Sequence, residues 1–320
     1  MLNLAVVGLG HIAQQHLAVL RDLPDVRLGA GVDTDRAVLQ ETGDRFAIAR
    51  RLTDIQPLLD DERPDAVFVL VSVLRVAEVS GAFLAAGIPT FLEKPPGLYT
   101  AQTRQLAATA RATGTLAMVG VNRRYYSTNL EGRRRLLDSG GLRTIAVEAH
   151  EDVDRIRRGT KFPLEVLRRW SAANGIHALD LLRFFGGQVA RVTAVQRTFD
   201  GPMPDACSAL IEFDSGALGR AAMDWTAPGG HRYEARGPGV TLTSEAGLTR
   251  LLWHARGRDP EAIELDEVDR AYKPGFYRQD CAFLDGVRRG AMPPFPACSL
   301  DDAVQTMALI DAIAGTGEAA

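Results

Sequence analysis

The sequence predicts an α/β protein that begins with a doubly wound parallel sheet and continues with an α+β domain built on a large open, mainly antiparallel sheet. Over residues 1–121, short apolar runs alternate with helical patterns, which is typical of parallel strands joined by crossover helices. From residue 189 to about residue 265, strand patterns follow one another without intervening helices, which indicates an antiparallel sheet.

The first domain is expected to cover residues 1–121. Short apolar runs predict strands at residues 4–7, 26–32, 66–71, 90–92 and 116–121. The run at residues 66–71 is continuous, which is typical of a strand covered on both faces. Helical periodicity predicts helices at residues 12–21, 35–46, 53–60, 76–86 and 101–112. Thr53 is the expected N-cap of the third helix, and Gly87 is expected just beyond the end of the fourth.

The second domain is expected to cover residues 122–320. Its predicted helices are residues 128–138, 178–185, 276–288 and 300–314. Its predicted strands are residues 142–151, 190–199, 206–213, 217–225, 231–236, 240–244 and 251–254. Ser299 is the expected cap of the last helix, and that helix is a candidate for packing back toward the first domain.

Composition narrows the class of protein. The chain has 320 residues, of which 46% are hydrophobic and 24% charged, and its net charge is −3. These values are typical of a globular protein with room for two domains, and they give no basis for binding nucleic acid or an anionic membrane. No apolar run reaches the ~18 residues of a membrane span.

The cysteines and the N-terminal residues indicate the compartment. Cys207, Cys281 and Cys298 are too few and too scattered for a disulfide framework or a zinc site, so we expect no metal. The chain begins with a strand pattern rather than a signal peptide. A reducing cytoplasm is therefore the expected location.

A glycine-rich motif follows the first predicted strand. The run Gly8-Leu9-Gly10-His11-Ile12-Ala13 fits the pattern G-x-G-x-x-G/A between a strand and a helix, the fingerprint of a dinucleotide-binding Rossmann domain. The first glycine permits a tight turn, the second lets the backbone approach a pyrophosphate, and the alanine allows close helix packing. A purely structural glycine turn is the alternative, but this context favours cofactor contacts from Gly8, Gly10, His11 and Ile12.

Asp33 ends the second predicted strand, about 20 residues beyond the glycines, where an acidic side chain can accept hydrogen bonds from the adenosine ribose. A carboxylate at this position repels a 2′-phosphate, so the sequence favours NAD. Arg36 is close enough to bind such a phosphate, which keeps NADP as the alternative.

Lys94 is one of only three lysines among 37 basic residues. An amine, unlike a guanidinium, can lose its proton near neutral pH in suitable surroundings. The alternative is a surface lysine without a role. Lys94 stands in the run Glu93-Lys94-Pro95, directly after the fifth predicted strand, and this context favours a functional role.

With this run and the glycine fingerprint, the chain resembles the Gfo/Idh/MocA oxidoreductases over essentially its whole length. Further matching segments are Asn122-Arg123-Arg124-Tyr125, Gly175-Ile176-His177-Ala178-Leu179-Asp180 and Phe283-Leu284-Asp285-Gly286, together with His16 one turn beyond the glycines. The resemblance implies a nicotinamide cofactor, a sugar or cyclitol substrate, and a homodimer or homotetramer formed through the open sheet.

The resemblance also implies roles for particular residues. Lys94 would lie beside the nicotinamide and the reacting hydroxyl, and His177 would be the acid/base group. Arg124 would help to shape the cofactor and substrate site. The expected cofactor contacts therefore also include Ser72, Glu93, Lys94 and Arg124. The expected substrate contacts are Lys94, Tyr125, Arg168, Asn174 and His177.

Two positions depart from the family pattern. Many members carry an aspartate four residues before the histidine, where this chain has Ala173, and a histidine in the helix after the fourth strand, where it has Val76. Asp180 lies three residues beyond His177 and can share its helix face, so it is either a replacement partner or part of an ion pair within its own helix. Asn174 is another candidate for orienting the histidine.

A basic stretch precedes the histidine segment. Its cations are Arg155, Arg157, Arg158, Lys161, Arg168 and Arg169. A solvated charged face explains such runs in most cases, whereas the functional alternative is a site for a substrate phosphate or carboxylate. Trp170 and the pair Tyr125-Tyr126 are candidates for stacking on a sugar ring, with packing at a domain interface as the alternative.

The leading hypothesis is an NAD(P)-dependent oxidoreductase that acts on a secondary hydroxyl of a sugar, sugar derivative or cyclitol, with phosphorylated and nucleotide-linked derivatives included. Oxidation of an alcohol needs a hydride acceptor and a base for the hydroxyl proton, and Lys94 and His177 would share the proton transfer. One alternative is an inactive dinucleotide-binding sensor or partner subunit, since the family aspartate is absent at Ala173. Another is an enzyme that uses bound NAD for transient oxidation during elimination or glycoside cleavage.

Overall fold

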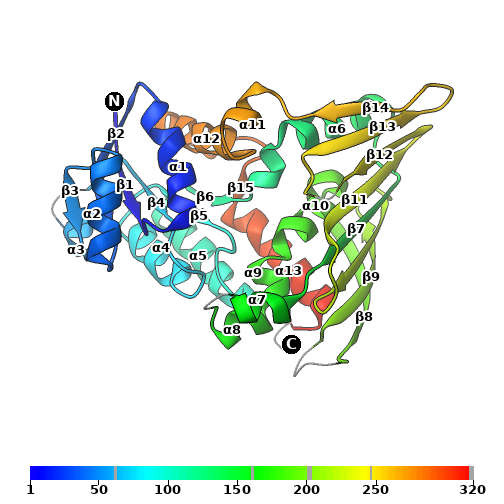
Figure 1. The fold of residues 1–320 in the computed structure, drawn as a ribbon, viewed down its shortest axis with the longest axis horizontal. Coiled ribbons are helices and arrows are strands. Elements are labelled where there is room, and N and C mark those ends of the chain that lie inside the picture. Colours follow the sequence, from blue (N-terminus) through cyan, green and yellow to red (C-terminus); the bar gives the residue numbers. More distant parts are fainter. Residues whose placement is uncertain (61–62, 160–161, 200–203, 246, 317–320) are drawn as a thin grey trace. The chain divides into compact units, whose positions relative to one another are not determined.

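The computed structural model describes residues 1–60, 63–159, 162–199, 204–245 and 247–316 (Figure 1). The chain divides into two compact units. Unit 1 contains residues 1–122 and 271–304, and unit 2 contains residues 123–270 and 305–320. A single boundary after residue 121 was expected, whereas residues 271–304 belong to unit 1. The last helix, α13 (Leu300–Ala314), begins in unit 1 and continues in unit 2.

Unit 1 is built on a sheet with the strand order β15-β6-β5-β4-β1-β2-β3. The strands are β1 (Leu2–Val7), β2 (Val26–Val32), β3 (Arg50–Leu52), β4 (Ala66–Val69), β5 (Thr90–Glu93), β6 (Ala117–Gly120) and β15 (Cys298–Ser299). The helices are α1 (His11–Asp22), α2 (Arg36–Arg45), α3 (Gln56–Asp60), α4 (Val76–Ala85), α5 (Thr100–Thr113) and α12 (Phe276–Arg289). β1 to β6 pair in parallel, and β15 joins the edge antiparallel to β6.

The sheet of unit 1 is covered on both faces. Ala5 and Val7 of β1 belong to an apolar cluster that also contains buried residues of α4 and α5. Leu4 and Val6 alternate with them along the strand and are also buried, so they point to the opposite face, on the side of α1 and α12. Strands that are buried on both faces are rich in apolar residues at successive positions, which is why the sequence predicted them.

Unit 2 is built on a sheet with the strand order β14-β13-β12-β11-β7-β10-β9-β8. The strands are β7 (Thr144–His150), β8 (Val189–Arg197), β9 (Ala206–Phe213), β10 (Leu218–Asp224), β11 (Gly230–Gly237), β12 (Val240–Ser244), β13 (Arg250–Ala255) and β14 (Glu261–Glu264). β7 and β10 run parallel, and the remaining neighbours pair antiparallel. The fold is therefore the predicted combination of a Rossmann-like parallel sheet and a mainly antiparallel one.

The helices of unit 2 follow the 3-10 turn η1 (Asn122–Tyr125) that links the two units in sequence. They are α6 (Ser127–Asp138), α7 (Val153–Gly159), α8 (Leu164–Arg168), α9 (Trp170–Ala173), α10 (Ile176–Gly186) and α11 (Glu267–Ala271). α10 packs on β7, β10 and β11, and α6 packs on β12 to β14 (Figure 1). The opposite side of the sheet exposes Leu210 (67%), Leu218 (55%) and Val195 (53%).

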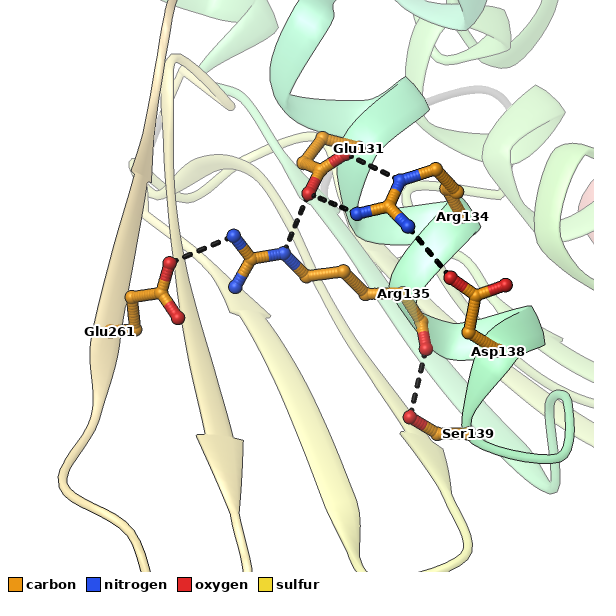
Figure 2. A network of polar contacts seen from close by, with 6 residues as sticks. All are labelled: Glu131, Arg134, Arg135, Asp138, Ser139 and Glu261. Carbon is orange, nitrogen blue, oxygen red and sulfur yellow. Dashed lines mark hydrogen bonds and ion pairs between the residues drawn. The ribbon is translucent and has the colours of Figure 1, made fainter.

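A network of charged side chains joins α6 to the edge strand β14 (Figure 2). Arg135 donates from Nε to Glu131 at 2.7 Å and from Nη2 to Glu261 on β14 at 2.8 Å. Arg134 bonds Glu131 and Asp138 on the same helix. Arg134 and Arg135 together lower the pKa of Glu131 to about 2, although partial burial opposes this effect. The acceptor of both guanidinium groups is therefore an anion throughout the neutral range.

Some elements differ from the sequence-based expectations. The short elements β3, β14, β15 and α11 were not predicted, and the basic stretch forms α7 and α8. The third helix begins at Gln56 rather than near Thr53, and its cap is Asp54, whose Oδ1 accepts the Gln56 N–H at 2.7 Å. Ser299 caps the last helix as predicted, accepting the Asp302 N–H at 3.1 Å. None of the described helices combines the length and the apolar character that crossing a membrane requires.

Candidate active site

The glycine loop after β1 contains Gly8 and Gly10, and the structure requires glycine at only one of these two positions. Gly8 has a φ of +85°, and a Cβ on it would lie 2.7 Å from the carbonyl oxygen of Leu70. Gly10 has an ordinary φ of −68°, and a Cβ on it would meet nothing within 4 Å. The fold therefore requires glycine at position 8. At position 10 the protein itself leaves open space.

The same loop leads into the N-terminus of α1. Gly10 is the N-cap residue of this helix, and no side chain caps the first turn. Uncapped N–H groups at a helix N-terminus, together with the helix dipole, favour an anion such as a pyrophosphate. The open space at Gly10 and the uncapped turn of His11 and Ile12 fit a dinucleotide.

Asp33 follows β2 and holds the glycine loop in place. Its Oδ2 accepts the Leu9 N–H at 2.8 Å, and its Oδ1 accepts the Asp35 N–H at 2.9 Å. Each carboxylate oxygen has a second lone pair, so these bonds are compatible with accepting a ribose hydroxyl. Arg36 begins α2 and is exposed.

Ser72 and Lys94 lie at the same edge of the sheet as the glycine loop. β4 is the parallel neighbour of β1, and β5 is the parallel neighbour of β4, so the carboxyl ends of all three strands face one edge. Ser72 is exposed shortly after β4, and Lys94 is half-buried directly after β5. The order of strands reverses between β1 and β4, and ligands of open α/β sheets bind at such a switch point.

His16 lies on the buried side of α1, and its side chain is fully buried. Its Nδ1 is 2.9 Å from both carboxylate oxygens of Asp280 on α12, and its Nε2 is 3.3 Å from Oε1 of Glu93. Burial alone would lower the pKa of His16, but the two carboxylates outweigh this effect and raise it to about 9. Burial raises the pKa of Asp280 to about 6, against the opposing effect of His16. His16 is therefore a buried imidazolium.

Aromatic rings and a glycine enclose this imidazolium. The ring centroids of Phe276 and Phe91 lie 4.6 and 5.1 Å from that of His16. Gly120 leaves room for the carboxylate of Glu93, because a Cβ there would be 2.9 Å from its Oε1. Glu93 was expected to contact the cofactor. That contact stays a prediction, and its carboxylate lies against His16, because a buried cation needs a counter-charge.

Arg124 and Asp180 form a buried ion pair in unit 2. The guanidinium donates from Nε to Oδ2 at 2.7 Å and from Nη2 to Oδ1 at 2.6 Å, and Thr306 also donates to Oδ1, at 2.9 Å. Arg124 is only 2% exposed, and its expected contact with the cofactor stays a prediction. Removing one partner of such a pair costs about 3–5 kcal/mol.

This ion pair also corrects both expectations for Asp180. Its carboxylate is bonded by Arg124 and Thr306, and not by His177 or by a partner within α10. His177 is the second residue of α10 and is partly buried, and its N–H donates to the carbonyl of Asn174 at 3.1 Å. The role of His177 in proton transfer thus stays a prediction.

Asn174 was expected to orient His177 or bind substrate. Its side-chain amide instead donates to both oxygens of Glu151, at 2.8 and 2.9 Å. The indole of Trp170 donates to the same carboxylate at 2.6 Å. The side chains of Asn174 and Trp170 are thus held in place by hydrogen bonds to the same carboxylate. Tyr125 is also buried, at 4% exposure, and Trp170 is buried at 6%, so packing rather than ring stacking accounts for their positions.

The basic stretch is mainly a solvated face. Arg155, Arg157 and Arg158 are exposed on α7, and Arg168 is exposed at the end of α8. Arg169 is the exception, since it is buried and donates to Asp311 at 2.5 Å. Lys161 lies outside the described residues. Contact between Arg168 and a substrate stays a prediction.

Two models of one protein family match the chain, one in each unit. The model described as "Oxidoreductase family, NAD-binding Rossmann fold" matches residues 2–121, and that of the GFO/IDH/MocA C-terminal domain matches residues 171–243. The chain belongs to the GFO/IDH/MocA family. This membership confirms the resemblance based on the glycine fingerprint, the E-K-P run and the histidine segment, and it makes unit 1 an NAD-binding Rossmann domain of an oxidoreductase.

Relatives within the GFO/IDH/MocA family include sugar and cyclitol dehydrogenases. The D-apiose dehydrogenase of Paraburkholderia graminis is 26% identical over 66% of this chain and 57% of that enzyme. The scyllo-inositol 2-dehydrogenase (NAD(+)) of Bacillus subtilis is 24% identical over 72% of this chain and 69% of that enzyme. The solved structure of GenD2 from gentamicin A biosynthesis, in complex with NAD, is 26% identical with a TM-score of 0.74, over 98% of this chain and 93% of that one.

Sequence reasoning missed three acidic or basic groups that the structure brings into view. His16 was noted only as part of the family pattern, and Asp280 and Glu151 were not singled out. A signal existed for two of them, because His16 and Asp280 interrupt the apolar faces of their helices, between Ala13 and Leu17 and between Phe276 and Phe283. Among the described residues, no group of three or more His, Cys, Asp or Glu side chains is arranged to hold a metal ion.

Proposed function

We propose that this protein is an NAD(P)-dependent dehydrogenase that acts on a secondary hydroxyl group, or the corresponding ketone, of a sugar, a sugar derivative or a cyclitol. The observation that carries the proposal is the common edge of the unit 1 sheet. There the carboxyl ends of β1, β4 and β5 bring together the glycine loop, Ser72 and Lys94. This arrangement pairs a cofactor site with an amine that can exchange a proton.

The residues of the glycine loop would hold the cofactor. The uncapped first turn of α1 would bind the pyrophosphate, since backbone N–H groups there have no side-chain partner. The carboxylate of Asp33 would accept the adenosine ribose hydroxyls, which favours NAD over NADP. When bound, the nicotinamide supplies a hydride acceptor or donor at its C4.

Lys94 and His177 would handle the proton of the substrate hydroxyl. Lys94 is half-buried directly after β5. An amine that is neutral part of the time can take a hydroxyl proton, which an arginine cannot do. His177 would relay that proton or hold the substrate oxygen, since an imidazole can both donate and accept a proton.

The substrate class rests on the relatives. The D-apiose and scyllo-inositol dehydrogenases act on polyhydroxylated rings by their names, and GenD2 comes from gentamicin A biosynthesis. A polyhydroxylated or aminated ring is therefore the substrate that we propose. The open face of the unit 2 sheet, with its exposed Leu210, Leu218 and Val195, would form a homodimer or homotetramer.

A substrate panel tests this proposal. Sugars, sugar phosphates, nucleotide sugars and inositols would be assayed with NAD and with NADP in parallel, by the absorbance of the reduced nicotinamide. We expect reduction of NAD by at least one ring polyol. Cofactor that binds without being reduced by any member of the panel, and without any reverse reaction with the ketones, would contradict the proposal.

A further inference from the structure

Glu151 is a carboxylate placed at the end of two parallel strands in unit 2. It follows β7 directly, and its backbone N–H donates to the carbonyl of Asp224 at the end of β10, at 3.0 Å. This bond fixes the backbone of Glu151 at the point where β7 and β10 end together. The location of the carboxylate is therefore set by the sheet.

The side chain of Glu151 is held from two sides. Trp170 donates to Oε2 at 2.6 Å, and Asn174 donates to both oxygens, at 2.8 and 2.9 Å. These two residues stand on either side of Ala173 in the chain, and Asn174 precedes His177 by one helical turn. The carboxylate thus lies at the junction of α9 and α10, next to the position where the family pattern has an aspartate.

His231 completes the surroundings of the carboxylate. Its Nε2 is 3.6 Å from Oε2 of Glu151, and its Nδ1 is 2.8 Å from Nη1 of Arg123. A guanidinium can only donate, so Nδ1 accepts and the ring proton is on Nε2, toward Glu151. Arg123 and Glu151 therefore lie on opposite sides of the imidazole ring.

Among the residues that the structure describes, no lysine or arginine side chain forms a hydrogen bond or an ion pair with Glu151. Burial would raise its pKa, but the nearby imidazole of His231 and the hydrogen bonds from Asn174 and Trp170 outweigh this effect and lower it. Among the described residues, His231 is its sole ion-pair neighbour within 4.0 Å. Partly buried charges are normally paired, yet 21% of this side chain stays exposed. Within the described part of the chain, Oε1 accepts a hydrogen bond only from Asn174.

We propose that Glu151 is a substrate-binding residue that accepts a hydrogen bond from a hydroxyl or ammonium group of the ring substrate. This inference rests on the proposed function and names a specificity-determining residue for it. Glu151 would bind and not exchange protons, because a carboxylate stabilised by three donors is a weak base near neutral pH.

Binding and turnover measured separately test this inference. The variant is Glu151→Gln, which keeps the size of the side chain and removes its charge. The control is Glu264→Gln, an exposed carboxylate of unit 2 that pairs with Arg250 on the neighbouring strand. Myo-inositol, D-glucose and D-glucosamine are titrated into the NADH-loaded proteins, and tryptophan fluorescence is followed because Trp170 contacts Glu151 directly. Melting temperatures and the Kd of NADH show whether each variant is folded.

We expect Glu151→Gln to weaken binding of the responsive probe on the order of ten- to a hundredfold, with the Kd of NADH unchanged and Glu264→Gln like the wild type. A larger loss for D-glucosamine than for D-glucose identifies the ammonium group as the donor, and an equal loss identifies a hydroxyl group. Glu151→Asp, which keeps the charge, should restore part of the affinity if Glu151→Gln folds poorly.

Two outcomes would overturn the inference. One is equal affinity of the wild type and Glu151→Gln for the probe. The other is the absence of any saturable fluorescence change in the wild type with all three probes. A wild type that binds a probe in a Glu151-dependent manner without turnover would contradict the proposed dehydrogenase activity and leave the binding role of Glu151 intact.

Discussion

Nε2 of His16 lies 3.3 Å from Oε1 of Glu93, the residue that immediately precedes Lys94. The contact ties the helix that follows the glycine loop to the turn that carries the proposed catalytic amine. Because His16 is also held by Asp280 on α12, three segments of unit 1 meet at one buried imidazolium. We infer that His16 is a positioning residue for Lys94.

The stability of the protein should depend on pH through His16. The pKa of His16 is raised to about 9, above its ordinary value of 6.5 in the unfolded chain, so the folded state binds more protons between these two values. Its contribution is fully present below pH 6.5 and is lost as pH rises toward 9. Asp280 is ionised in both states above pH 7, so it does not add to this slope. Chemical denaturation at several pH values should show unfolding free energy falling across this window.

An NMR titration provides a direct check on His16. The imidazole signals of His16 should change near pH 9. The variant His16→Gln should lack the slope in unfolding free energy. An imidazole of His16 that titrates near 6.5 would rule out the buried imidazolium.

The two glycines of the cofactor loop should respond differently to alanine. Gly10→Ala should leave the melting temperature unchanged, because the added Cβ meets nothing within 4 Å. It should nevertheless raise the Kd of NAD on the order of tenfold or more, because the Cβ occupies the space of the pyrophosphate. Gly8→Ala should destabilise the protein by at least about 1 kcal/mol through its positive φ. Calorimetric titration with NAD and thermal unfolding measure both effects, and an unchanged Kd in Gly10→Ala would argue against a dinucleotide at this loop.

The choice between NAD and NADP should depend on Asp33 and Arg36. We expect the wild type to prefer NAD, because the Asp33 carboxylate repels a 2′-phosphate. Arg36→Gln should reduce kcat/KM for NADP by about tenfold and leave kcat/KM for NAD unchanged, since only NADP carries the 2′-phosphate. Steady-state rates with both cofactors check this. A wild type that strongly prefers NADP would refute our interpretation of Asp33.

Assembly should depend on the open face of the unit 2 sheet. Leu210 is 67% exposed there, and it lines a groove of about 380 Å³ together with Val195 and Ala222. Leu210→Glu should shift the protein toward the monomer in analytical ultracentrifugation, because burying an unpaired charge is costly. Leu137→Glu is the control, since Leu137 is also exposed but lies on α6. A monomeric wild type would disprove assembly through this face.

Local sequence patterns predicted most of the fold because the main elements have strong periodicity. The bounds of β2, β9, β12 and α13 agree with those expected, since apolar spacing in these segments is regular. β3 and β14 were missed because Arg50-Arg51-Leu52 and Glu261-Ala262-Ile263-Glu264 are short and largely polar. Their strand conformation comes from pairing with a neighbour, which no local pattern encodes.

The residues of the candidate site also divide into those that a local sequence pattern predicts and those that it does not. The glycine loop could be predicted because its residues are consecutive in the sequence. Each glycine has a recognisable role in the backbone conformation of the loop. The pair of His16 and Asp280 could not, since the two residues are 264 positions apart and meet only after α12 packs on α1. Glu151 was likewise hidden, because its partners Trp170 and Asn174 come from a separate helix.

The central claim is that Lys94 exchanges a proton with the substrate beside the cofactor. The most direct test compares initial rates of Lys94→Met with those of the wild type on the substrate found by the panel, with His177→Ala measured beside it. We predict that kcat falls about 10²- to 10⁴-fold in Lys94→Met, with the melting temperature unchanged. Turnover by Lys94→Met at the wild-type rate would contradict the account.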